Sequence, residues 1–370
     1  DNGTWELKNL NFNTDITTSG AGLTLKLMGD CEFNAVTVSS GDTLDLNNNR
    51  MELSGNLNGQ LKDTGSGNGQ IWTTGGINFV GFTSDGSLTT TDYISMASQT
   101  HYLKPFPFRT VMMNGNSTPS FGNYAPSFAT TNFIMSSGNL SDIGQDASAS
   151  GTMTVNNATI ATGGTLTAGG ATLSCAGDFT TSGGLLGPSC MDQGIKATRE
   201  DAADALRISG DRTIEFWVKY PSSDRPSGGS TYPFVEKQSY GYYVALDENG
   251  KVKAGIASGA STSVTSATAI DDNKWHHVAW VFDENTTDTG HKIYIDGKLE
   301  GQATSGAGKT GEACQFRVGT GRANVYMDEV RLWDDIRTQT EIRANMFTEV
   351  TSGAIAVYNF NEGTAGTAAD

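Results

Sequence analysis

Two pairs of adjacent side chains have types that could do acid–base or metal chemistry. Asp328 and Glu329 are neighbouring carboxylates, and His276 and His277 are neighbouring imidazoles. Carboxylates can act as general acid and base, and imidazole moves protons or ligates metals. Both pairs lie in strand-like sequence, where successive side chains point to opposite faces of a sheet. We therefore expect neither pair to act as a catalytic unit, and we identify no catalytic residue.

The chain lacks the short motifs of common hydrolases and nucleotide-binding proteins. No G-x-S-x-G elbow, H-E-x-x-H helix or glycine–lysine phosphate loop occurs in its 370 residues. The cysteines form no C-x-x-C pair, which disfavours a zinc site. Cys175 and Cys190 could form a disulfide in an oxidising compartment, and free buried thiols are the alternative.

Charge and hydropathy exclude two classes of partner. The formal net charge is −16, whereas nucleic-acid binding needs clustered Lys and Arg that displace counterions from phosphate. We therefore expect no nucleic-acid partner. No apolar run approaches the ~18 residues of a membrane-spanning helix, so we expect no membrane insertion. Because the sequence starts at Asp1 without a signal-like segment, we expect a processed product or a piece of a longer protein.

The elements that position these residues are strands. Apolar and polar residues alternate over 212–219, which is typical of a strand. The almost wholly apolar run 278–282 predicts a mid-sheet strand covered on both faces. Asp296-Gly297 between two such runs predicts a tight hairpin turn. Thr338 and Glu341 have capping-box spacing, which predicts one short helix. The 46 glycines agree with an all-β chain of many turns.

The order of the strand-like segments carries a family resemblance. The segments are RTIEFWVK at 212–219, WHHVAWVF at 275–282, KIYIDGK at 292–298, NVYMDEVRLWDD at 324–335 and VYNFNEG at 357–363. This series resembles a laminin G-like, concanavalin A-like jelly roll over about residues 195–370. The resemblance implies two antiparallel sheets, and it favours recognition over catalysis.

The resemblance also implies site residues. Hydrolases of that fold usually carry two catalytic carboxylates in an E-x-D-x-x-E string on one strand, and no such string occurs here. Many relatives bind calcium through the Asp that opens the penultimate strand, which corresponds to Asp328, so calcium is the candidate cofactor. The alternative is that Asp328 hydrogen-bonds backbone at a sheet edge. Tyr240 and Tyr242 are candidate ligand-binding residues, expected as exposed loop aromatics.

The N-terminal half has a different pattern. Short alternating runs such as 36–38, 44–46 and 51–53 are separated by Gly, Ser, Asn and Asp, and similar runs return over 153–180. This pattern resembles the rungs of a β-solenoid stalk of viral fibre or adhesin type, in which stacked rungs bury an inward residue from each strand. An irregular antiparallel β-sandwich is the alternative.

These observations predict an all-β protein of two modules. Residues 1–190 form a short-rung β-solenoid or β-sandwich module, and residues 195–370 form the concanavalin A-like, laminin G-like jelly roll. A stalk with a lectin-like domain suits a non-enzymatic attachment protein, most simply a fibre, tail or capsid-surface component of a phage virion. We expect it at the virion surface or at an extracellular or cell surface. Its expected partners are a glycan or cell-surface receptor, copies of itself and other virion or surface proteins. A bacterial surface adhesin and a purely structural assembly protein without glycan binding are the alternatives.

Overall fold

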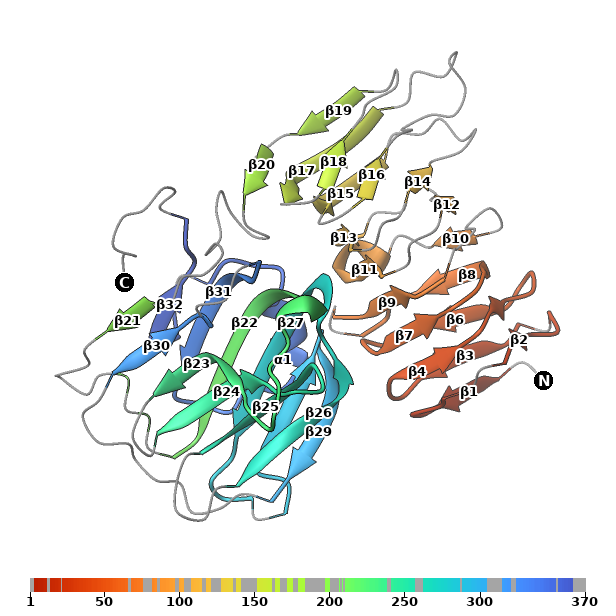
Figure 1. The fold of residues 1–370 in the computed structure, drawn as a ribbon. Coiled ribbons are helices and arrows are strands. Elements are labelled where there is room, and N and C mark those ends of the chain that lie inside the picture. The colour runs from red at the N-terminus through yellow and green to blue at the C-terminus, as the bar shows by residue number, and fades with distance from the viewer. Residues whose placement is uncertain are drawn as a thin grey trace. The chain divides into compact units, whose positions relative to one another are not determined.

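The computed structural model divides the chain into two compact units, Asp1–Gly183 and Gly184–Asp370. We call them the solenoid unit and the jelly-roll unit (Figure 1). The structure describes residues 3–183 and 197–361 apart from internal segments, of which the longer ones are 76–81, 103–107, 121–127, 141–151, 167–171, 200–205, 257–261 and 305–314. Within these described ranges, no helix is long and apolar enough to cross a membrane.

The solenoid unit is built from short strands that pair in parallel wherever the structure describes a pair. The first sheet follows the order β1 (Thr4–Leu7), β3 (Thr24–Leu27), β6 (Thr43–Asp45), β8 (Leu57–Lys62), β5 (Val36–Thr37) and β2 (Ile16–Thr17), with β10 (Phe82–Ser84) beside β8. The second follows β19 (Thr172–Cys175), β17 (Thr152–Ala161), β15 (Phe128–Met135), β13 (Thr110–Met113), β11 (Asp92–Ser95), β9 (Gln70–Thr73), β7 (Arg50–Leu53) and β4 (Cys31–Phe33), with β20 (Phe179–Gly183) beside β17. Two small pairs, β12 (Thr100–Tyr102) with β14 (Thr118–Ser120) and β16 (Gly138–Leu140) with β18 (Gly164–Leu166), and the 3-10 turn η1 (Ser87–Thr90) complete it.

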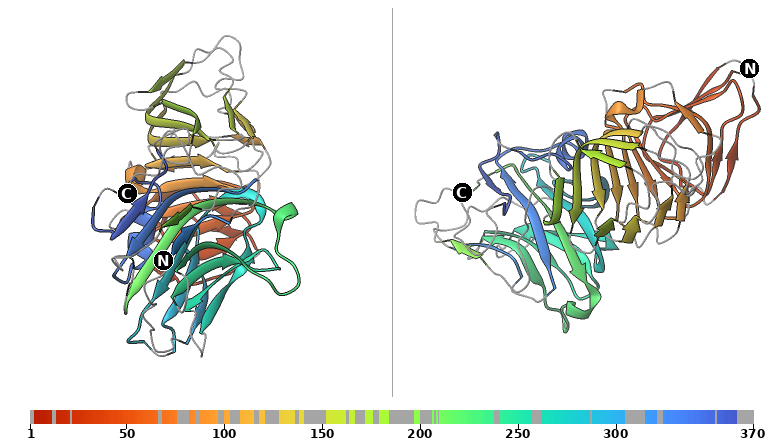
Figure 2. Two further views of the ribbon diagram at one scale, coloured as in Figure 1. Left: turned by 60° about the vertical axis from the view of Figure 1, so that its left-hand side comes forward. Right: turned by 90° about the horizontal axis from the view of Figure 1, so that it is seen from above.

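Inward side chains of successive rungs stack in columns. Leu25 is in register with Leu44, Leu44 with Leu61, and Val36 with Leu57, and all five are buried in one apolar core. Figure 2 shows the parallel strands of this unit lying side by side. Parallel rungs that bury one column each are the defining feature of a solenoid. The solenoid prediction is therefore confirmed, and the antiparallel sandwich alternative is wrong.

Buried Asp side chains hold the corners between rungs. The Asp63 carboxylate accepts hydrogen bonds from the backbone N–H of Asn48 (2.8 Å), the backbone N–H of Gly69 (3.1 Å) and the Thr91 hydroxyl (2.9 Å). Asn48 has a φ of 65°, a left-handed conformation that Asn tolerates better than most residues. The polar spacers of the sequence are thus corners whose backbone groups are satisfied internally.

The jelly-roll unit consists of two antiparallel sheets. One follows the order β21 (Ala197–Arg199), β30 (Phe316–Val318), β23 (Tyr232–Lys237), β24 (Tyr242–Leu246), β25 (Lys251–Ile256) and β26 (Ser263–Ala269). The other follows β29 (Lys298–Ala303), β28 (His291–Ile295), β27 (Asp272–Phe282), β22 (Arg212–Pro221), β31 (Tyr326–Trp333) and β32 (Ala356–Tyr358). Their inner faces share one core, in which the rings of Phe216 and Phe234 lie 5.4 Å apart. A 3-10 turn, η2 (Ser222–Asp224), follows β22, and helix α1 (Gln339–Asn345) follows β31.

Local predictions for this unit are confirmed. Strand β27 lies between β28 and β22, and its residues 275–282 are all buried. Asp296 and Gly297 both have positive φ, 54° and 73°, and connect β28 to β29 as a tight turn. Thr338 caps α1 in a reciprocal capping box with Glu341. Sequence patterns therefore located the elements around the candidate site correctly.

Candidate functional site

The structure pairs Asp328 with a neighbouring strand on one side. It lies on β31, opposite Trp217 of β22, and its side chain is fully buried. Asp328 Oδ1 accepts a hydrogen bond from the backbone N–H of Glu329 at 2.9 Å. A hydrogen bond to backbone is what the alternative to calcium binding predicted for this side chain. Strand β32 pairs with residues 330–332 of β31, so among the described pairs Asp328 lies where β31 is paired on one side, with β22.

Asp328 is not part of a cluster of three or more metal-binding side chains among the residues that the structure describes. Calcium takes six to eight oxygen ligands, usually including several carboxylates. Among the residues that the structure describes, no three His, Cys, Asp or Glu side chains gather in an arrangement that could hold a metal. We therefore derive no chemistry from a metal at this position, and calcium binding stays a prediction.

A bulge changes the alternation expected at Asp328 and Glu329. Glu215 pairs with Arg331 and Trp217 with Asp328, so Glu329 and Val330 together lie opposite one residue of β22. Glu329 has a φ of 51°, which is rare for a residue other than Gly, Asn or Asp. The Glu329 carboxylate lies beside Arg331, two residues further along the strand.

These residues form a buried charge cluster between β22, β31 and the segment that contains α1. Arg331 Nη2 lies 2.8 Å from Glu329 Oε2, and Arg331 Nη1 lies 3.4 Å from Glu215 Oε1. The Arg331 guanidinium also donates to the backbone carbonyls of Asn345 and Thr348. Burial, opposed by the charge of Arg331, raises the pKa of both Glu215 and Glu329. All three side chains are at most 1% exposed, so the cluster ties the α1 segment to the sheet and leaves no room for a substrate.

The two adjacent histidines enter different environments. His276 Nδ1 lies 2.8 Å from Asp296 Oδ2, and its Nε2 lies 3.0 Å from Asp272 Oδ1. Burial opposes a charge on His276, but these two carboxylates outweigh it and raise its pKa to about 10. His277 instead packs edge-on against Trp217, and burial together with the charge of Arg331 holds its pKa well below the ordinary value. The shifts move the two pKa values in opposite directions, that of His276 above its ordinary value and that of His277 below it, which does not favour proton exchange by this pair near pH 7.

The expectation of an exposed Tyr242 is wrong. Tyr242 is the first residue of β24 and is 2% exposed, because it alternates inward with Val244 and Leu246. Its hydroxyl donates to the Leu206 carbonyl at 3.0 Å, and its ring lies 5.7 Å from the Arg212 guanidinium. Tyr242 is a core residue. Tyr240 lies outside the described residues, as do Cys175 and Cys190 for any side-chain contact.

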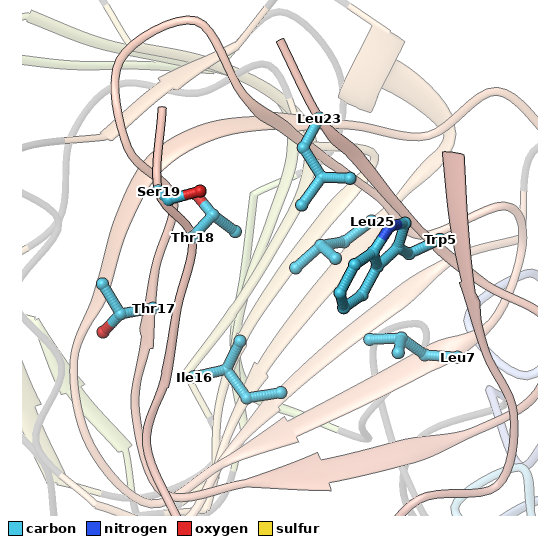
Figure 3. A pocket seen from close by; sticks show the side chains of 8 residues that line it. All are labelled: Trp5, Leu7, Ile16, Thr17, Thr18, Ser19, Leu23 and Leu25. Carbon is cyan, nitrogen blue, oxygen red and sulfur yellow. The ribbon is translucent and has the colours of Figure 1, made fainter. Parts of the chain in front are cut away.

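A pocket occurs at the N-terminal end of the solenoid unit, where sequence reasoning assigned nothing. It measures about 310 Å³, and segment 17–19 contributes hydroxyl side chains to its wall (Figure 3). We call it the solenoid mouth, and its apolar wall consists of Trp5, Leu7, Ile16, Leu23 and Leu25. The alternation in Thr4–Leu7 was a signal for its first strand. The buried charge cluster had a signal as well, because Glu329 and Arg331 occupy alternate positions of a strand.

Comparisons with known proteins bear on the jelly-roll unit. A search of curated proteins gives no match. Solved structures similar to this chain include the binding domain of Paraclostridial Mosquitocidal Protein 1 (13% identity, TM-score 0.34, 43% of this chain and 47% of that chain). A second is the receptor binding domain of botulinum neurotoxin mosaic serotype C/D (15% identity, TM-score 0.33, 40% of this chain and 38% of that chain). A third is the binding domain of botulinum neurotoxin DC in complex with SialylT (14% identity, TM-score 0.32, 41% of this chain and 40% of that chain). The matched region spans less than half of each of these chains.

The family assignment rests on a separate match and on the sheets themselves. Residues 192–343 match the model of the concanavalin A-like lectin/glucanases superfamily. The two six-stranded antiparallel sheets around one core are the architecture that this family implies. Residues 192–343 therefore form a concanavalin A-like domain, which follows a parallel β-solenoid in the same chain.

Proposed function

We propose that this protein is a non-enzymatic attachment protein, in which the concanavalin A-like domain binds a glycan or a cell-surface receptor and the solenoid unit serves as a stalk. Its place is a virion surface, as a fibre, tail or capsid-surface component of a phage, or otherwise an extracellular or cell surface. The observation that carries the proposal is the combination of a family that includes lectins with a parallel solenoid. Single lectin-like sites bind weakly, so copies acting together make attachment effective.

The buried charge cluster supports the absence of hydrolysis. A glycosidase needs two accessible carboxylates ~5–10 Å apart, one of which can give up a proton. The Glu215 and Glu329 carboxylates are bridged by Arg331 and closed off from solvent. They therefore support a structural role for the acidic residues on this face of the sheet.

The test is a glycan array probed with the assembled protein, followed by a depolymerisation assay on each glycan that binds. We expect binding without release of oligosaccharide. Released oligosaccharide would overturn the non-enzymatic proposal. No binding by a verified multimer would favour a purely structural assembly protein.

The remaining ligand candidates call for variants. Tyr240 stays a candidate ligand platform, and we expect Tyr240→Ala to weaken glycan binding without a change in melting temperature. Tyr242→Phe is the matched control, since it removes a buried hydroxyl and lowers the melting temperature while glycan binding persists. Calcium binding is tested by melting curves recorded with the ion and with a chelator. We expect a higher melting temperature with calcium, because a ligand that binds only the folded state stabilises it.

A further inference from the structure

The outer face of the first jelly-roll sheet carries a tyrosine to which sequence reasoning assigned nothing. Tyr242, Val244 and Leu246 of β24 point into the core. Because successive side chains of a strand point to opposite faces, Tyr243 points outward, where it is half-buried. Tyr243 is therefore the aromatic residue that β24 offers to a ligand, in place of its neighbour Tyr242.

The Tyr243 ring lies along the sheet and turns one of its faces outward. Tyr243 is in register with Gly255 of β25, and Gly255 with Ser263 of β26. The Tyr243 hydroxyl hydrogen-bonds to the Ser263 side chain, two strands away. Two strand spacings are about 10 Å, which a tyrosine spans only when its side chain lies along the sheet. The ring therefore crosses Gly255, which has no side chain to hold it off the backbone, and its other face is directed away from the sheet.

Cationic side chains share this face of the sheet. Lys253 lies on β25 opposite Ala245, the next outward residue of β24, and Lys251 precedes it by two residues. Both lysines are half-buried, and among the described side chains neither ammonium group has an ion-pair partner. Arg317 of β30 lies 3.1 Å from Glu236 of β23, so that carboxylate is already paired. The face is therefore positive, in a chain whose net charge is −16.

The acid nearest to these lysines in sequence is engaged in a turn. Asp247 Oδ1 accepts the backbone N–H groups of Asn249 at 2.8 Å and Lys251 at 2.9 Å, between β24 and β25. These bonds hold the carboxylate at the turn. Lys253, two residues further from the turn, is left as a cation for a ligand.

An acidic sugar has the chemistry that fits this combination. The apolar C–H face of a sugar ring packs on an aromatic face, while polar groups at its edge meet polar side chains. A hexuronic acid carries its carboxylate on the ring itself, so a ring stacked on Tyr243 extends this group sideways over the sheet. Lys253 is one strand and two residues away, a diagonal neighbour at about 7–8 Å that a long side chain reaches across. Its ammonium group can donate a charge-assisted hydrogen bond to the carboxylate.

We propose that the jelly-roll unit binds a polysaccharide with hexuronic acid units on this face, with a sugar ring stacked on Tyr243 and its carboxylate bound by Lys253. Lys251, further along β25, is placed for the carboxylate of a neighbouring unit. This inference rests on the proposed function, because it names the class of glycan and the face that binds it. A polymer that repeats the same acidic unit lets weak contacts on several copies of the protein act together.

The test measures binding of the full chain to immobilised polygalacturonate and hyaluronan, to the carboxyl-reduced form of each, and to dextran sulfate. We expect binding to the carboxylated polymers that weakens as salt is added, because salt screens exposed charges. Equal binding to the carboxyl-reduced polymers would overturn the role of the carboxylate. Binding to dextran sulfate alone would overturn the choice of a uronic acid over a sulfated glycan.

Variants of the two contact residues locate the site. Lys253→Glu should raise the dissociation constant for polygalacturonate by roughly tenfold. The control is Lys292→Glu, which makes the same charge change on the outer face of the other sheet and should bind as the wild type does. Tyr243→Ala should also raise the dissociation constant roughly tenfold, whereas Tyr243→Phe keeps the ring and should retain binding.

Melting curves of every variant separate a lost contact from a lost fold. If Tyr243→Ala does not fold, Lys253→Glu decides, because it changes a half-buried side chain on the outer face of the sheet. Glycan binding that Lys253→Glu and Tyr243→Ala leave unchanged overturns this inference and leaves the proposed function standing. A folded wild-type chain that binds neither these polymers nor any glycan of the array overturns both.

Discussion

At the scale of single residues, buried ionisable groups give each unit its own dependence on pH. In the solenoid unit, Asp42 accepts the backbone N–H groups of Gly20 and Leu23 at 2.7 Å each. The Thr18 side chain, together with these amides and against desolvation, lowers the Asp42 pKa to about 2. In the jelly-roll unit, His276 has its pKa raised to about 10 by Asp296 and Asp272. The two groups act at opposite ends of the pH range.

Asp42 predicts sensitivity of the solenoid unit to acid. A carboxylate whose folded pKa lies below its unfolded value of about 4 stabilises the fold above that pH, and the contribution is lost as pH falls to about 2. We expect Asp42→Asn to lower the melting temperature at pH 7 and to flatten its fall between pH ~4 and ~2. Thermal melts of both proteins across this range measure the effect. Parallel curves would show that Asp42 does not titrate as expected.

His276 predicts sensitivity of the jelly-roll unit to base. Its folded pKa is raised above the unfolded value of about 6.5, so its stabilisation is complete below pH ~6.5 and is lost as pH rises toward ~10. Replacement His276→Gln keeps a hydrogen-bond donor and removes the charge. We expect it to cost about 2 kcal/mol of unfolding free energy at pH 6 and to flatten the alkaline slope. Denaturant unfolding at several pH values is the measurement, and an unchanged slope would contradict the assignment.

At the scale of elements, backbone conformation decides how closely neighbouring rungs approach. Gly59 on β8 has a φ of 106°, and a Cβ there would collide with the Val38 carbonyl of the adjacent rung. Gly41 also has a positive φ, 91°, but a Cβ there would meet nothing within 4 Å. Substitutions at these two glycines can therefore separate the effect of backbone strain from the effect of a steric clash.

This pair gives a matched prediction. Gly41→Ala should cost about 1 kcal/mol, the usual penalty for a side chain at positive φ. Gly59→Ala should cost about 3 kcal/mol, because overpacking against the neighbouring rung adds to the same strain. Denaturant unfolding of both variants checks the difference. Equal losses would mean that the rungs separate easily at Val38.

Sequence patterns predicted elements better than they predicted burial. Alternation and capping located β27, the turn at Asp296 and helix α1, because these signals are local. The bulge at Glu329 was missed, since a positive φ at Glu has no compositional signal. Burial of the charge cluster was also missed, because the return of the α1 segment over β31 is a tertiary contact that local sequence patterns do not show. The exposure of Tyr242 was predicted wrongly for the same reason, because it depends on contacts with the facing sheet.

At the scale of the molecule, the two units have separate cores. Among the described side chains, the solenoid core contains residues from 25 to 133, and the jelly-roll core contains residues from 206 to 360. Expressed alone, residues 195–370 should fold into a β-rich domain that melts cooperatively. Circular dichroism of this fragment provides the check. An unfolded or helix-dominated spectrum would show that the domain depends on the first unit.

The two pairing patterns also set the order in which the units can be completed during synthesis. Neighbouring rungs pair residues close in sequence, as Trp5 does with Leu25, so the solenoid can grow rung by rung behind the ribosome. In the jelly-roll unit, Glu215 pairs with Arg331, 116 residues later. Strand β22 therefore keeps one unpaired edge until nearly the whole unit has been translated. During that interval, the nascent chain carries a finished solenoid and an unpaired edge of β22 that other strands can pair with. Mispairing is therefore most costly at this stage of synthesis.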